Sequence, residues 1–111
     1  MTDATERRRG VMIAMFDIPE SLDEEFNKWY DEEHIPALAG VPGCLMARRY
    51  RITSVNSDGR QRYLALYHLT SPEVCSSDAW KKAANTEWTA RVRPYFRDGL
   101  RIPLRKYKRA A

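Results

Sequence analysis

The sequence has few of the residues that stabilise small secreted or metal-binding domains. Its 111 residues include two cysteines and two histidines. Cys44 and Cys75 are too few for a disulfide framework, so we expect free thiols and a cytoplasmic location. The histidines show no zinc-ligand spacing, and HExxH and CxxC motifs are missing. We therefore expect neither a metal nor another cofactor.

Long apolar runs and nucleotide-binding motifs are also missing. No apolar run approaches the roughly 18 residues of a membrane-spanning helix, so we expect no membrane partner. The five glycines form neither a phosphate loop nor a dinucleotide-binding fingerprint. A serine nucleophile elbow is not present either. An enzyme with this sequence would depend on acid–base side chains and a shaped apolar pocket.

The net charge of +4 is unevenly distributed. Basic residues gather at residues 7–9 and 101–109, whereas residues 17–33 hold eight carboxylates. So acidic a segment argues against a phosphate-binding face, and we expect no nucleic-acid partner. We expect residues 1–9 to form a flexible basic arm and residues 10–111 to form a single domain.

The apolar pattern predicts strands and helices in the order βαββαβ. Residues 11–18 are apolar at nearly every position, as in a strand buried on both faces. Further strands are predicted over residues 44–53, 62–69 and 100–107, and Pro103 favours an edge position for the last one. This order is typical of a ferredoxin-like α+β fold with an antiparallel four-stranded sheet. A second copy of the sheet would cover the remaining apolar face, so we expect a homodimer.

Residues 29–36 contain the strongest candidate for chemistry. His34 lies one helical turn beyond Tyr30, so their side chains can meet. Pro36 predicts a helix end near His34, where the helix dipole and the neighbouring carboxylates would favour imidazolium. His34 is thus a candidate general acid or base near neutral pH. The alternative is a helix cap that bonds the last carbonyl groups.

The sequence leaves open whether Glu33 or His34 points into the protein. With 3.6 residues per turn, Glu33 falls at the centre of an apolar stripe and His34 at its flank. Either Glu33 is buried and paired, or the helix distorts before Pro36 and turns His34 inward. The stripe consists of Leu22, Phe26, Trp29 and Tyr30.

Arg48 and Arg49 lie on opposite faces of one predicted strand, so one of them points toward a buried face. A buried guanidinium requires a carboxylate or an anionic ligand. One interpretation is a clamp for a substrate carboxylate, enolate or phenolate. The other is an ion pair with Glu33 or Asp17, or across the dimer. Four aromatic side chains could line a pocket for a flat apolar molecule, although each could also be plain core: Tyr50, Tyr63, Tyr67 and Trp88.

Several of these segments together resemble a known superfamily. They are Glu25-Phe26-x-x-Trp29-Tyr30-x-x-x-His34-x-Pro36, Leu38, Val41-Pro42-Gly43, Ala47-Arg48-Arg49-Tyr50, Tyr63-Leu64-Ala65-Leu66-Tyr67, Ser71-Pro72-Glu73 and Trp88-Thr89. Over residues 11–108 the sequence resembles the dimeric α+β barrel superfamily, in particular a bacterial branch of its EthD-like members. His34 matches the family histidine, and Tyr30 stands where EthD-like sequences commonly have tryptophan.

The resemblance implies a homodimeric α+β barrel with a pocket between each sheet and its own helices. It also implies a small cofactor-independent enzyme of isomerase, cyclase, lyase or monooxygenase type. Such an enzyme would act on a hydrophobic aromatic, polyketide-like or lactone substrate. His34 would move a proton, Tyr30 or Tyr67 would hydrogen-bond the reacting oxygen, and Arg48 or Arg49 would hold an anionic group. The alternative is a non-catalytic small-ligand-binding or accessory subunit.

Overall fold

The computed structural model describes residues 9–53 and 61–107, and within this part the side chains of residues 61, 97 and 98 are not described. Its sheet has the strand order β2-β3-β1-β4, with every neighbouring pair antiparallel. The strands are β1 (Gly10–Ile18), β2 (Cys44–Arg51), β3 (Gln61–Leu69) and β4 (Arg97–Arg105). The predicted four-stranded α+β fold is confirmed, and β4 with Pro103 lies at a sheet edge.

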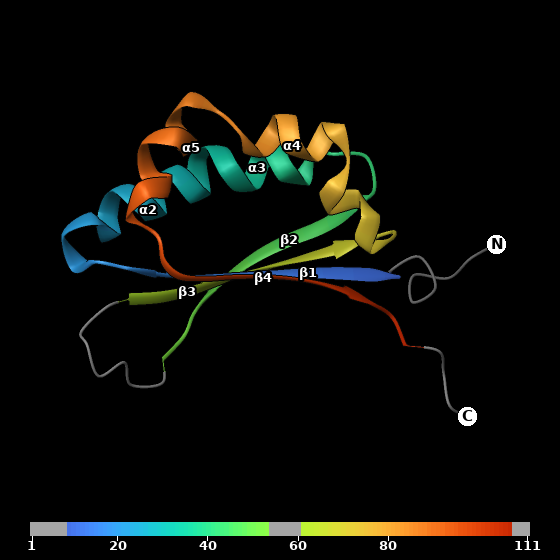
Figure 1. Cartoon of the computed structure of the whole chain (residues 1–111), viewed down its shortest axis with the longest axis horizontal. Coiled ribbons are helices and arrows are strands. Elements are labelled where there is room, and N and C mark those ends of the chain that lie inside the picture. The colour runs from blue at the N-terminus through green and yellow to red at the C-terminus, as the bar shows by residue number, and fades with distance from the viewer. Residues whose placement is uncertain (1–8, 54–60, 108–111) are drawn as a thin grey trace.

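All helical segments cover one face of this sheet (Figure 1). The first helical connection consists of a 3-10 turn η1 (Glu20–Leu22), α2 (Asp23–Trp29), a π-helical turn η2 (Tyr30–His34) and α3 (Ile35–Ala39). The second consists of η3 (Pro72–Ser76), α4 (Asp78–Ala84), α5 (Glu87–Val92) and η4 (Arg93–Tyr95). None of the helices in the described ranges is long and apolar enough to cross a membrane.

The two faces of the sheet have different surroundings within the chain. The helix-facing side chains of β1 and β3, such as Met12, Ala14 and Tyr67, are buried. On the opposite face, Val11, Ile13 and Leu66 are only half-buried and line a groove of about 490 Å³. This outer face is the apolar surface for which the sequence predicts a second layer.

The first helical connection does not end near His34, so that prediction is wrong. A π-helical turn replaces the regular helix over Tyr30–His34, and the chain continues as α3 to Ala39. Pro36 is tolerated because it stands in the first turn of α3, where the missing backbone N–H costs little. The basic arm expected over residues 1–9 falls outside the described residues, except for Arg9.

Candidate active site

A cavity of about 600 Å³ lies between the sheet and its helices. Its volume is in the range of pockets that enclose small organic molecules. Apolar and aromatic side chains form most of its lining, and a few polar groups reach into it. The lining residues are Met12, Ala14, Phe16, Trp29, Tyr30, His34, Leu38, Tyr67, Cys75, Ser76, Trp80, Lys81, Ala84, Asn85, Thr89, Arg93, Phe96 and Arg101.

The π-helical turn brings the His34 imidazole into this cavity. The backbone N–H of Ile35 bonds to the Tyr30 carbonyl, which is the i+5 spacing that defines a π turn. His34 therefore packs on the side chain five residues before it: its ring lies 4.4 Å from that of Trp29, at 30°. The Tyr30 ring meets it edge-on at 4.9 Å. Of the two arrangements left open by the sequence, the distorted helix is observed.

Glu33 is also paired, because the same turn directs it toward α5. The Thr86 hydroxyl donates to Glu33 Oε2 at 2.7 Å and lies 2.9 Å from the Thr89 hydroxyl. Thr89 in turn accepts the indole N–H of Trp29 at 3.2 Å. This chain of hydrogen bonds fixes the Trp29 ring, on which His34 stacks.

His34 is a neutral imidazole at neutral pH. Burial, with the positive charges of Arg93, Arg101 and Arg49, lowers its pKa from 6.5 to about 4. The predicted bias toward imidazolium is wrong for two reasons. The helix does not end at His34, so no dipole terminus acts there. Asp31 and Glu32 are exposed at the surface, whereas Arg93 and Arg101 act from the cavity lining. His34 Nδ1 is buried without a hydrogen-bond partner among the described residues.

Two buried tyrosines stand beside His34 in the cavity wall. The hydroxyl oxygens of Tyr30 and Tyr67 lie 3.3 Å apart. Burial raises the pKa of both phenols, and that of Tyr67 well above its usual range. Both hydroxyls are therefore protonated at neutral pH. Whichever hydroxyl donates to the other, the acceptor keeps its own proton for a ligand oxygen.

The other predicted site residues lie outside the cavity lining. Arg49 stacks over the Tyr30 ring at 4.4 Å and donates to Asp31 Oδ1 at 2.7 Å and to Asn27 Oδ1 at 2.6 Å. It faces the helices as an ion-paired support for Tyr30. Arg48 is exposed on the outer side of β2.

Two aromatic candidates are also distant from the His34 side chain. Tyr50 is 49% exposed. The indole of Trp88 donates to Glu25 at 3.0 Å, near the helix surface. The structure thus brings together His34, Tyr30 and Tyr67, and it leaves Arg48, Arg49, Tyr50, Glu33 and Trp88 outside the cavity.

Sequence reasoning missed the cationic residues of the cavity. Arg93 follows α5 and Arg101 stands on β4, opposite Ala14 in the sheet register. Nothing in the local sequence distinguishes them from the other basic residues of the C-terminal region. Their common position follows only from the packing of α5 and β4 around β1.

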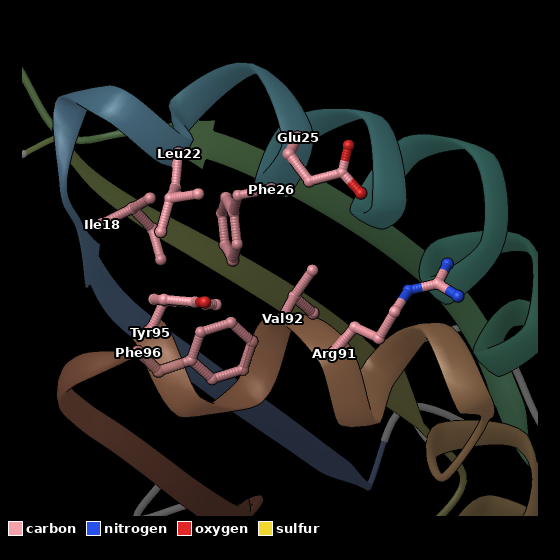
Figure 2. Close-up of a pocket in the computed structure, with 8 residues that line it drawn as sticks. All are labelled: Ile18, Leu22, Glu25, Phe26, Arg91, Val92, Tyr95 and Phe96. Carbon is pink, nitrogen blue, oxygen red and sulfur yellow. The ribbon is translucent and has the colours of Figure 1, made fainter.

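A second, smaller cavity of about 150 Å³ lies between α2 and α5. Figure 2 shows Phe26, Val92 and Phe96 facing one another across it, with the Arg91 guanidinium reaching away from this cluster. Phe96 also lines the larger cavity and so separates the two. No histidine or buried tyrosine is among the described residues that line the smaller cavity, so the candidate acid–base groups belong to the larger one.

Comparison with solved structures shows the ferredoxin-like fold. The chain is similar to a "putative antibiotic biosynthesis monooxygenase" from Bordetella bronchiseptica, with 17% identity, 90% of this chain and 99% of that chain covered, and a TM-score of 0.68. It is also similar to a dimeric ferredoxin-like protein from an uncultured marine organism, with 14% identity, 96% of each chain covered, and a TM-score of 0.67.

A third similar structure is a "putative antibiotic biosynthesis monooxygenase" from Deinococcus radiodurans, with 8% identity, 92% of this chain and 96% of that chain covered, and a TM-score of 0.66. No curated protein matches the sequence. Residues 11–100, which include every side chain proposed for acid–base chemistry, match one sequence family. The chain therefore belongs to the family described as "Domain of unknown function (DUF4286)".

Proposed function

We propose that this protein is a small acid–base enzyme that removes a proton from a hydrophobic, enolisable substrate, such as an aromatic, polyketide-like or lactone molecule. The observation that carries the proposal is the neutral His34 imidazole, with an unpaired Nδ1, beside two protonated tyrosine hydroxyls in one cavity. A neutral base next to hydrogen-bond donors is what enolate formation requires.

In this mechanism, His34 accepts a proton from a C–H or O–H group of the substrate. The electron pair of the broken bond moves to the substrate oxygen, which becomes an enolate or phenolate. The Tyr30–Tyr67 pair donates a hydrogen bond to that oxygen, in surroundings where few waters compete. Imidazolium His34 then returns the proton to another substrate atom, which completes an isomerase, cyclase or lyase type of reaction.

Three finer assignments belong to this proposal. The neighbours named as antibiotic biosynthesis monooxygenases share this fold, and an enolate is also a reasonable starting point for reaction with oxygen. The His34–Pro36 segment supports placement near the EthD-like branch of the dimeric α+β barrel superfamily. The cytoplasmic location expected from the free thiols also remains part of the proposal.

We also propose that two copies pack their sheets together through the outer faces. Val11, Ile13, Leu66 and Leu104 make that face apolar, and Leu104 is 42% exposed in one chain. An apolar sheet face of this kind is stabilised by a second layer. A neighbour with the same fold is described as dimeric, which supports this arrangement.

Deuterium exchange into 2-tetralone, an enolisable bicyclic ketone, tests proton abstraction without knowledge of the natural substrate. In D₂O at neutral pH we expect the protein to accelerate exchange at the carbon next to the carbonyl, as followed by proton NMR. His34→Ala should lower this rate by roughly 10² or more, because the general base is gone. Tyr67→Phe should lower it less, since Tyr30 retains a hydroxyl.

The matched control is His68→Gln. His68 is the second histidine of the chain, and it lies on the outer face of the sheet, away from the large cavity. This variant should accelerate deuterium exchange into 2-tetralone as much as the wild type does. An unchanged rate in His34→Ala would remove His34 from the mechanism. Binding of tetralone without any acceleration would instead favour the non-catalytic ligand-binding subunit.

A further inference from the structure

Among the described residues that line the large cavity, all charged side chains have the same sign. Lys81 from α4, Arg93 from η4 and Arg101 from β4 reach it, and no carboxylate is among its described lining residues. Between them the wall is aromatic, with Trp29, Tyr67 and Trp80. We infer that the cavity binds an aromatic carboxylate, with the ring between the sheet and helices and the carboxylate on Arg93 and Arg101. This inference rests on the proposed function, because it names the substrate class of the same site.

Arg101 is the more informative of the two arginines. Its Cα pairs with that of Ala14, a buried residue of the helix-facing side, so the guanidinium is directed to the cavity and not to the outer face. It makes no hydrogen bond or ion pair with the part of the chain that the structure describes. Three other arginines pair with carboxylates: Arg49 with Asp31, Arg62 with Asp17, and Arg105 with Glu73.

Arg93 is held in place while most of its donors stay available. Its Nη2 donates to Asn85 Oδ1 at 2.8 Å, and Asn85 Nδ2 donates to the Lys81 carbonyl at 2.7 Å. A guanidinium has five N–H donors in a planar fork that matches the two oxygens of a carboxylate. Because Asn85 also lines the cavity, this anchor positions the fork at the cavity wall.

A bound carboxylate would also change the strength of the base. The positive charges of Arg93 and Arg101 oppose protonation of His34. An anion on these arginines offsets their field, so proton transfer to His34 becomes more favourable when the substrate is bound. The anion site and the base are therefore coupled, although they need not touch.

Calorimetric measurement of the binding of two matched probes to the 111-residue chain tests this inference. The probes are 2-naphthoate and the neutral 2-naphthalenemethanol, which have the same ring system and differ in charge. We expect naphthoate to bind at least tenfold more tightly to the wild type. Arg101→Gln and Arg93→Gln should each weaken naphthoate binding by about tenfold, the loss of a charge-assisted contact, and leave naphthalenemethanol within twofold.

Arg91→Gln is the control, because Arg91 lies two residues before Arg93 and lines the smaller cavity. It should bind both probes as the wild type does. Thermal unfolding shows that each variant is folded, and the two test variants lie on different elements, so one remains informative if the other fails to fold.

Three results would overturn the inference. The first is equal affinity of the wild type for both probes, or no naphthoate binding at all. The second is naphthoate binding that neither arginine variant weakens more than Arg91→Gln does. The third is tighter, equally arginine-dependent binding of 2-naphthyl phosphate, which would assign the site to a phosphate. The tetralone exchange rate is measured independently of these binding results. Failure of the carboxylate inference is therefore distinguishable from failure of the proposed function.

Discussion

At the scale of single residues, the surroundings of His34 decide what chemistry is available. A neutral imidazole can accept a proton, so in the proposed mechanism the first proton transfer runs from substrate to His34. The protonated phenols of Tyr30 and Tyr67 have the complementary role of donors. Two kinds of titratable group, with pKa values shifted in opposite directions, thus share one cavity.

The lowered pKa of His34 predicts that acid destabilises the fold. In the unfolded chain, His34 takes up a proton near pH 6.5, whereas in the folded chain it does so at about 4. Between these values the unfolded chain binds more protons, so the free energy of unfolding falls as the pH falls through this window. The full contribution approaches about 3 kcal/mol.

Urea unfolding at pH 7.5 and pH 4.5 measures this contribution. Other groups also titrate in this interval, so the comparison is with His34→Gln, which lacks the imidazole. We expect the wild type to lose more stability than the variant, by roughly 2 kcal/mol. Equal losses would mean that His34 is already hydrated in the folded protein.

At the scale of elements, the π-helical turn accounts for the main difference between sequence and structure. Apolar periodicity assumes 3.6 residues per turn, and on that assumption Glu33 is the inward residue and His34 lies at the flank. One wide turn changes the phase after Tyr30. His34 then faces the cavity, and Glu33 meets Thr86 of the next helical connection. No residue pattern in a single sequence specifies such a turn.

The strand positions and the burial of Tyr67 were more predictable. The apolar run of β1 and the alternation in β3 are local signals, so strand positions and the buried state of Tyr67 follow from them. The shared position of His34 and Tyr30 also follows from helical spacing. The locations of Arg93 and Arg101 depend on which elements pack together, and this information is not local.

The threonine network between the two helical connections has a testable role. Thr86 accepts the backbone N–H of Thr89 as an N-cap and donates to Glu33. Thr86→Val removes the hydroxyl at nearly constant volume, so we expect a loss of about 1–2 kcal/mol in unfolding free energy. Thr86→Ser keeps the hydroxyl and should retain most of the stability. Equal stability of the valine variant and the wild type in urea unfolding would contradict the assigned role.

At the scale of the whole molecule, the two faces of the sheet form two different surfaces. The helix-facing side contributes Met12, Ala14 and Tyr67 to the cavity wall, while the opposite side presents an apolar groove. Since side chains alternate along β1 and β3, the same strands build both surfaces. The candidate active site therefore depends on both helices and sheet, and the outer face is the surface on which we propose assembly.

The proposed dimer predicts a specific response to charge on the outer face. The wild type should sediment as a dimer at micromolar concentration. Leu66→Glu should sediment as a monomer, because a buried carboxylate without a partner opposes association. Ala90→Glu adds the same charge to the exposed surface of α5 and should leave the dimer intact. A wild type that sediments as a monomer would contradict the proposed assembly.

Titration of the His34 ring by NMR tests the central claim most directly, because the proposed chemistry requires a neutral imidazole enclosed between helices and sheet. The His34 signal is identified by its disappearance in His34→Gln. We predict a midpoint at about pH 4, below that of an imidazole in water. A midpoint near 6.5, the ordinary value for histidine, would show that the ring is solvated and would contradict the proposed base.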